Sequence, residues 1–321
     1  MGEPRLKSSF IYLANAVNDL RDNWRSLALV LAPLVLLGAL CLLPDALNLQ
    51  HRLAAAFEPG AQNISLLPAQ TPYAPSREGG PPLFPIWFTL TLHLLFLLIT
   101  VAAGLVVLVA LRGTDGRERG GMPEAIEVYR RAIAFAPAYA WVLLLQLIIP
   151  AVGIGLAILF ASQSSSLFAA LEFLGIVVTV FGWVLFLWLY FAPFALVFDG
   201  KHSWYALLFS RELMRKQFFR TAIRIVVFLA VWSGYNSWTS GAFVVVSLLI
   251  GPVGYYAGVL WIAIFFTDLL GVAVTYATNA FFIAAGARLY RDLTALLAER
   301  SAAAAQRALG PTVALTSSAH L

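Results

Sequence analysis

Long apolar stretches alternate with shorter polar segments along the whole chain. Six of these stretches have about the 20 residues that a helix needs to cross the hydrocarbon core of a membrane. They cover residues 26–44, 85–111, 132–160, 168–197, 222–250 and 258–287. None shows the apolar–polar alternation of a membrane-spanning strand. The pattern therefore predicts an all-α polytopic membrane protein with six transmembrane helices.

The basic residues favour one orientation of these spans. Nineteen of the 21 lysines and arginines lie in segments that an alternating path places on one side of the membrane. These segments are 1–25, 112–131, 198–224 and 288–321. Only Arg52 and Arg77 lie in the opposite loops. Because an excess of Lys and Arg marks cytoplasmic loops, we expect both termini in the cytoplasm.

An amphipathic segment precedes each outward-going span. Its apolar residues recur at the spacing of a helix that lies in the lipid headgroup layer. They are Phe10, Leu13, Ala14, Val17 and Trp24 in the first segment, Met122, Ala125, Ile126 and Tyr129 in the second, and Tyr205, Leu208, Phe209 and Leu213 in the third. The basic residues expected at the membrane surface are Arg130, Arg131, Arg215, Lys216 and Arg220. The sequence thus predicts three cytoplasmic surface helices in a threefold helix–span–span pattern. They either anchor the protein separately or form a collar around one vestibule.

Two polar regions flank this pattern. The outer loop, residues 45–84, is rich in proline and is expected to be irregular. The tail begins as a helix, with Leu289, Leu293, Leu296 and Leu297 near one face, and frays after Gly310. We therefore expect one membrane domain over residues 1–310 and a disordered tail over 311–321.

Composition supports the membrane assignment. The chain is 61% apolar and 12% charged, whereas soluble domains contain about 25% charged residues. Such a chain cannot cover a water-exposed surface, which excludes a soluble enzyme. The chain is basic, with a pI near 9.5. Its charge is spread over short loops, so nucleic acid is not expected as a partner. The N-terminal segment lacks the apolar region of a removable signal peptide.

One hairpin resembles a known group of proteins. The run Tyr190-Phe-Ala-Pro-Phe-Ala-Leu-Val-Phe-Asp-Gly-Lys201 is followed by Ser203-Trp-Tyr-Ala-Leu207 and Ser210-Arg-Glu-Leu213. This pattern resembles the cytoplasmic hairpin of bacterial six-span proteins that include the membrane domain of some glycerophosphodiester phosphodiesterases. The resemblance implies a six-span fold in the bacterial inner membrane. No cluster of Glu, His and Asp accompanies it, so this chain resembles the membrane part alone and the phosphodiesterase activity is not carried over.

Sequence motifs for catalysis or metal binding are absent. The four histidines lie far apart, Cys41 is the only cysteine, and no phosphate-binding loop or serine nucleophile elbow occurs. We therefore expect no enzymatic activity, no metal and no cofactor.

Polar residues inside the spans are the candidate ligand or proton site. Asp268 lies about ten residues into the last span, near mid-bilayer depth, and Thr275 and Asn279 share its helix face. His93 lies at a comparable depth in the second span. Intramembrane acids are costly and are functional hypotheses by default. Asp268 either forms a hydrogen bond that holds two helices together or is a proton or ligand site. His93 is either a hydrogen-bonded core residue or the partner of Asp268.

The fifth span has a polar and aromatic island in its middle. Tyr235, Asn236 and Trp238 lie in it, and Ser233, Ser237 and Gly241 form a face of small residues. This face is suited to close helix packing. Alternatively, the helix bends or breaks here and exposes its backbone to a ligand.

These features leave three functions open. The leading hypothesis is a non-enzymatic protein that binds or moves lipid or another hydrophobic ligand in the bacterial envelope. The second is a proton-linked transporter or channel that uses Asp268. The third is a structural or assembly protein whose cytoplasmic helices dock a protein partner.

Overall fold

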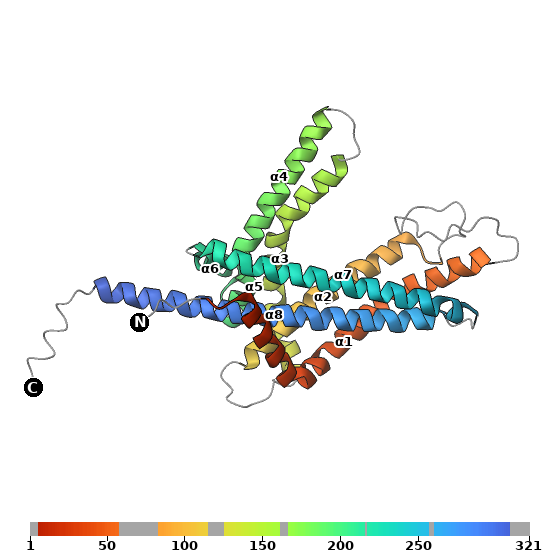
Figure 1. The fold of residues 1–321 in the computed structure, drawn as a ribbon, viewed down its shortest axis with the longest axis horizontal. Coiled ribbons are helices and arrows are strands. Elements are labelled where there is room, and N and C mark those ends of the chain that lie inside the picture. The colour runs from red at the N-terminus through yellow and green to blue at the C-terminus, as the bar shows by residue number, and fades with distance from the viewer. Residues whose placement is uncertain are drawn as a thin grey trace, which may run out of the picture. The chain divides into compact units, whose positions relative to one another are not determined.

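The protein is built from helices. The computed structural model describes residues 6–57, 83–114, 125–160, 166–215, 217–256 and 260–308, and these residues contain no strand. The helices are α1 (Ser9–Phe57), α2 (Ile86–Thr114), α3 (Ala125–Phe160), α4 (Ser166–Leu189), α5 (Ala192–Phe198), α6 (Ser203–Arg215), α7 (Phe218–Tyr256) and α8 (Leu260–Ala308) (Figure 1). Six are long and apolar enough to span a membrane. The all-α polytopic class is confirmed.

The helix boundaries differ from the predicted ones at several points. The first two amphipathic segments continue into their spans within α1 and α3, and only the third forms a separate helix, α6. The prediction of an irregular chain from residue 45 is wrong as far as Phe57, because α1 continues to that residue. Residues 46–57 are mostly Ala, Leu and other good helix formers, and the first proline after Pro44 is Pro59. The rest of the outer loop, and the tail from residue 311, lie outside the described residues.

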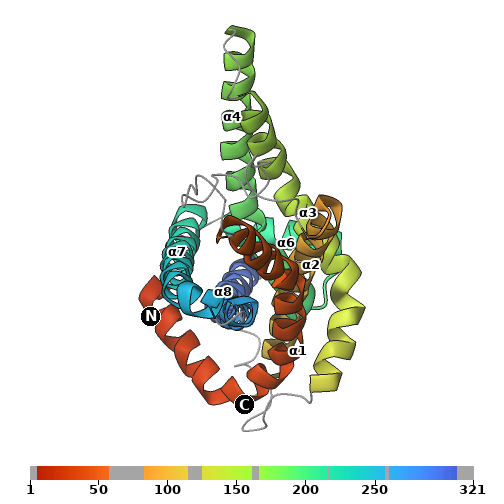
Figure 2. The ribbon, with the colours of Figure 1, turned by 90° about the vertical axis from the view of Figure 1, so that its right-hand side faces the viewer.

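The chain divides into two compact units. The first comprises Met1–Trp24, Val107–Ala230 and Phe281–Leu321, and the second comprises Arg25–Val106 and Val231–Ala280. Helices α1, α2, α7 and α8 each contribute residues to both. In the second unit, the segments of α7 and α8 lie side by side in both views (Figure 2).

Glycines bring α3 and α4 into close contact. These helices form an antiparallel hairpin in the first unit (Figures 1 and 2). A Cβ atom on Gly153 would lie 2.5 Å from the backbone nitrogen of Thr179, and one on Gly182 would lie 2.6 Å from that of Pro150. Most other hairpin side chains point outward, among them Trp141, Phe173 and Phe181. The two backbones therefore pack directly against each other, and the apolar side chains are left for lipid.

A break separates α4 from α5. Pro193 has no backbone N–H, so the carbonyl of Leu189 loses its helical donor. The side-chain amide of Gln146 on α3 donates to this carbonyl instead. The hydroxyl of Ser210 on α6 donates to the Trp188 carbonyl at 2.9 Å and accepts from the Phe191 N–H at 3.1 Å. Two buried side chains thus satisfy the backbone groups that the break exposes.

Ion pairs fix the start of α1 to the end of α8. The Arg288 guanidinium binds both carboxylate oxygens of Asp19, and the Tyr12 hydroxyl donates to Asp292 at 2.8 Å. On the opposite face of α1, the side chains of Phe10 and Val17 are exposed. The first amphipathic segment therefore has a polar attachment to the first unit and an apolar face open to lipid.

We expect the Gly153→Ala substitution to destabilise the α3–α4 hairpin. The added Cβ would meet backbone atoms of α4, and overpacking of this kind costs about 1–3 kcal/mol. Gly155→Ala is the matched control, because nothing lies within 4 Å of its Cβ position and alanine favours a helix. The measurement is thermal unfolding of both variants in mild detergent. Equal midpoints for the two variants would contradict the proposed backbone contact.

We expect Ser210→Ala to destabilise the break between α4 and α5. The substitution leaves the Trp188 carbonyl and the Phe191 N–H without the Ser210 hydroxyl, and each unsatisfied buried group costs about 1–3 kcal/mol. Hydrogen exchange at residues 188–191 should accelerate. Ser301→Ala removes only a local helical bond from an exposed serine and serves as control. Unchanged exchange in Ser210→Ala would show that the hydroxyl does not hold the break.

Candidate functional site

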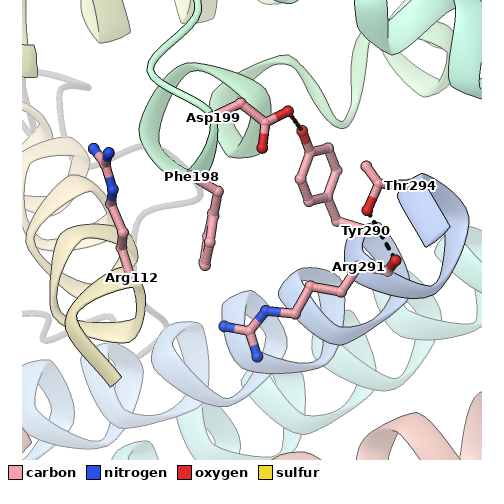
Figure 3. Close-up of a pocket in the computed structure, with 6 residues that line it drawn as sticks. All are labelled: Arg112, Phe198, Asp199, Tyr290, Arg291 and Thr294. Atoms are coloured by element: carbon pink, nitrogen blue, oxygen red, sulfur yellow. Dashed lines mark hydrogen bonds between the residues drawn. The ribbon is translucent and has the colours of Figure 1, made fainter. Parts of the chain in front are cut away.

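The end of α5 that lies farther from the break lines a cavity of about 360 Å³ in the first unit. Its walls come from the last turn of α2, the end of α5 and one face of α8 (Figure 3). The lining residues are Arg112, Phe198, Asp199, Tyr290, Arg291 and Thr294. We call this cavity the arginine pocket. It lies at the end of the spans that carries most of the basic residues, which we call the basic end.

Tyr290 holds the floor of the arginine pocket in place. Its side chain is 2% exposed and its ring stacks on Phe194, with 6.0 Å between the ring centroids. Phe198 lies on the same ring at 6.2 Å. A Cβ on Gly286, one turn earlier on α8, would lie 2.8 Å from the Phe194 ring. Close packing of α5 against α8 therefore fixes the position of the aromatic floor.

Asp199 supplies one negative charge at the rim. Its carboxylate accepts a hydrogen bond from the Tyr290 hydroxyl at 2.7 Å (Figure 3). The Lys201 ammonium lies 3.9 Å from the same carboxylate. Gly200 between them has φ +65°, a conformation that favours glycine and turns the chain out of α5. Burial lowers the pKa of Lys201, while the charges of Asp199 and Glu212 oppose that change. The Asp199 charge is thus already balanced before any ligand enters.

Two arginines line the pocket. Figure 3 shows Arg112 reaching in from α2, with the Phe198 ring between it and Tyr290. The Arg291 guanidinium carbon lies 5.2 Å from the centroid of the Phe198 ring. That of Arg112 lies 5.7 Å from the Phe135 ring on α3. Aromatic contacts therefore orient both guanidinium groups.

The predicted surface basic residues lie elsewhere. Arg130 and Arg131 bind Glu127 on the same helix, at 2.8 and 2.7 Å. Arg215 lines a second cavity of about 250 Å³ between α6 and α8. Arg220 is exposed, and Lys216 lies outside the described residues. None of the three amphipathic segments contributes a described residue to the lining of the arginine pocket, so the pocket gives no support to a collar around it.

Sequence reasoning did not identify the arginine pocket. Asp199 and Lys201 belong to the run that carries the family resemblance, but they received no functional role. Arg112 and Arg291 entered only the charge balance. The sequence feature that could have indicated this pocket is Pro193. It interrupts an apolar helix just before a charged turn and so indicates a structured helix end.

In the second unit, the structure places the intramembrane histidine beside a different acid from the one expected. His93 Nε2 lies 3.2 Å from the Asp45 carboxylate on α1, and its Nδ1 lies 2.8 Å from the Thr89 carbonyl. Asp268 on α8 lies within electrostatic range of Asp45. The sequence offered Asp268 as one possible partner of His93, and residue 45 stood at the edge of the predicted loop. Since α1 continues past residue 45, Asp45 instead lies on a membrane helix.

The other predicted site residues are spread over α7 and α8. Asn279 accepts a hydrogen bond from the Trp232 indole at 2.8 Å, which joins the two helices. Thr275 and Asn236 are half-buried, but Tyr235 and Trp238 are exposed, Trp238 by 82%. Helix α7 is continuous through this region, so the alternative of a break does not occur. Nothing in the described residues lies within 4 Å of a Cβ on Gly241, so that end of the small-residue face is not packed here.

The described residues offer no group of three or more His, Cys, Asp or Glu side chains arranged to hold a metal ion. Comparison with protein-family models, with curated proteins and with solved structures gives no match to this chain. The resemblance to the phosphodiesterase-associated membrane domains therefore stays a prediction. The fold and the chemistry of the two polar sites are the basis for a functional proposal.

Proposed function

We propose that this protein is a non-enzymatic, multi-pass inner-membrane protein that binds or moves an anionic lipid. The observation that carries the proposal is the arginine pocket, which Arg112 and Arg291 line together and in which the Arg291 guanidinium lies 5.2 Å from the Phe198 ring. Guanidinium groups bind phosphate oxygens through paired N–H donors, and aromatic rings accept the glycerol and acyl carbons next to them. The ligand class is an amphiphile with a phosphate headgroup.

The side chains that line the pocket support an anionic ligand. Two of the six lining residues are arginines and one is an acid, Asp199, whose carboxylate lies 3.9 Å from the Lys201 ammonium. The volume of about 360 Å³ lies within the range of small-molecule sites and is large enough for a phosphate ester headgroup.

The position of the pocket on the helices also supports a lipid. Arg112 lies in the last turn of α2, and Arg291 lies one turn beyond Arg288 on α8. Basic residues at the ends of membrane helices lie at the level of the headgroups. With the basic end on the cytoplasmic side, as the loop charges favour, the pocket would take lipid from the inner leaflet of the bacterial inner membrane.

The experiment is native mass spectrometry of the protein released from membranes in mild detergent. We expect the wild type to retain a phospholipid and the Arg112→Gln/Arg291→Gln double variant to lose it. A hydrogen bond to a charged group contributes about 1.5–3 kcal/mol. Each arginine should therefore change the affinity by about tenfold or more.

The matched control is Arg130→Gln. It removes the same charge from an exposed arginine that pairs with Glu127 outside the pocket. Equal loss of lipid in the control and in the double variant would mean that general headgroup attraction holds the lipid. Retention of no lipid beyond the annular background by the wild type would overturn the proposal and favour a structural or assembly role.

A further inference from the structure

Asp45 and His93 are in contact, and the geometry of this contact indicates how many protons the two side chains hold. The Thr89 carbonyl can only accept a hydrogen bond, so His93 Nδ1, 2.8 Å away, carries a proton. His93 Nε2 faces the Asp45 carboxyl oxygen at 3.2 Å. This contact is favourable only if one proton lies between the two atoms. It then belongs either to an imidazolium beside a carboxylate or to a carboxylic acid beside a neutral imidazole.

We infer that Asp45 and His93 share one exchangeable proton and that this pair is a proton-binding site of the second unit. With the proton bound, the pair has no net charge and a hydrogen bond joins α1 to α2. Without it, a carboxylate faces the lone pair of Nε2, the net charge is −1, and the bond is lost. Proton release therefore removes a direct tie between two membrane helices.

The groups around the pair determine when it holds its proton. Asp268 on α8 is the other acid within electrostatic range of Asp45 that the structure describes. The buried Cys41 thiol lies one turn before Asp45 on α1, and the Tyr276 hydroxyl of α8 binds Thr100 of α2. Both are neutral near pH 7. Helix α7 contributes Tyr235 to this unit, and its side chain is exposed.

The position of the three residues along their helices indicates which side supplies the proton. About 20 residues, or about 30 Å of helix, separate Asp45 from Arg25, His93 from Arg112 and Asp268 from Arg288. This length equals the hydrocarbon thickness of a bilayer. This separation places Asp268 nearer the membrane boundary opposite the basic end, and not at the mid-bilayer depth predicted from its apolar stretch. The pair therefore exchanges protons with the side opposite the basic end.

The inference goes beyond lipid binding and uses none of the pocket residues. It is tested by counting protons taken up by the purified protein between about pH 5 and pH 9, with infrared difference spectra of the carboxyl groups. We expect Asp45→Asn and His93→Gln each to lose the same single titration, because one proton belongs to both residues. Asp22→Asn and His202→Gln alter exposed residues of the first unit and should retain this titration.

Two outcomes would overturn the inference. Separate titrations, one lost in each variant, would show that the residues bind protons independently. No difference between either variant and the wild type would show that the pair does not titrate. If both variants fail to fold, nitrogen-15 NMR of the wild-type imidazoles decides, because a shared proton requires the His93 Nε2 signal to titrate while Nδ1 keeps its proton.

The native Cys41 reports on the helices directly. Its side chain is 6% exposed and lies one turn from Asp45 on α1. If proton release loosens α1, alkylation of Cys41 should rise with pH more steeply in the wild type than in Asp45→Asn. The ionisation of the thiol itself is common to both proteins. Identical pH profiles would mean that the proton does not hold α1 in place. Lipid retention by the arginine-pocket variants is a separate readout, so failure of either proposal can be recognised alone.

Discussion

A single missing backbone donor organises the first unit. Pro193 cannot donate to the Leu189 carbonyl, and hydrocarbon offers no water to replace that bond. The chain satisfies the exposed groups with Gln146 from α3 and Ser210 from α6, which fixes three helices around the break. The short helix α5 then starts in a new place, packs its aromatic side chains on Tyr290 of α8 and ends at Asp199. The arginine pocket depends on this arrangement, because the α5 residues of its floor and its rim come directly after the break in the chain.

Neutralisation of charge is the second constraint, and both units meet it in the same way. Each acidic side chain that we assign to a site has a donor close by: Tyr290 and Lys201 beside Asp199, and His93 beside Asp45. A lone carboxylate in this setting would be costly. The difference between the sites lies in what remains after pairing. Arginines outnumber acids in the lining of the arginine pocket, which suits an anion, whereas the Asp45–His93 pair is neutral only with its proton and is suited to proton exchange.

The sequence predicted the features that depend on composition over about 20 residues, and it missed those that depend on a partner in another helix. Six spans and the all-α class follow from apolar length alone. The extent of α1 did not, because the prolines from Pro59 onward were taken to describe the whole segment after residue 44, including its helix-forming first part. Because of that error, Asp45 was placed in the outer loop, and Asp268 was the acid considered as a possible partner of His93. The arginine pocket was missed because Arg112 and Arg291 are separated by 179 residues and meet only through packing.

The distribution of the two sites over the helices sets a condition for any coupling between them. Helix α2 carries both His93 and Arg112, and helix α8 carries both Asp268 and Arg291. A bound lipid changes proton affinity only if it favours one arrangement of these helices over another, and a ligand with equal affinity for both arrangements shifts nothing. Where such a difference exists, linkage is reciprocal: a proton that strengthens lipid binding must itself be bound more tightly when lipid is present. Movement of lipid driven by protons would require this coupling, whereas lipid binding alone would not.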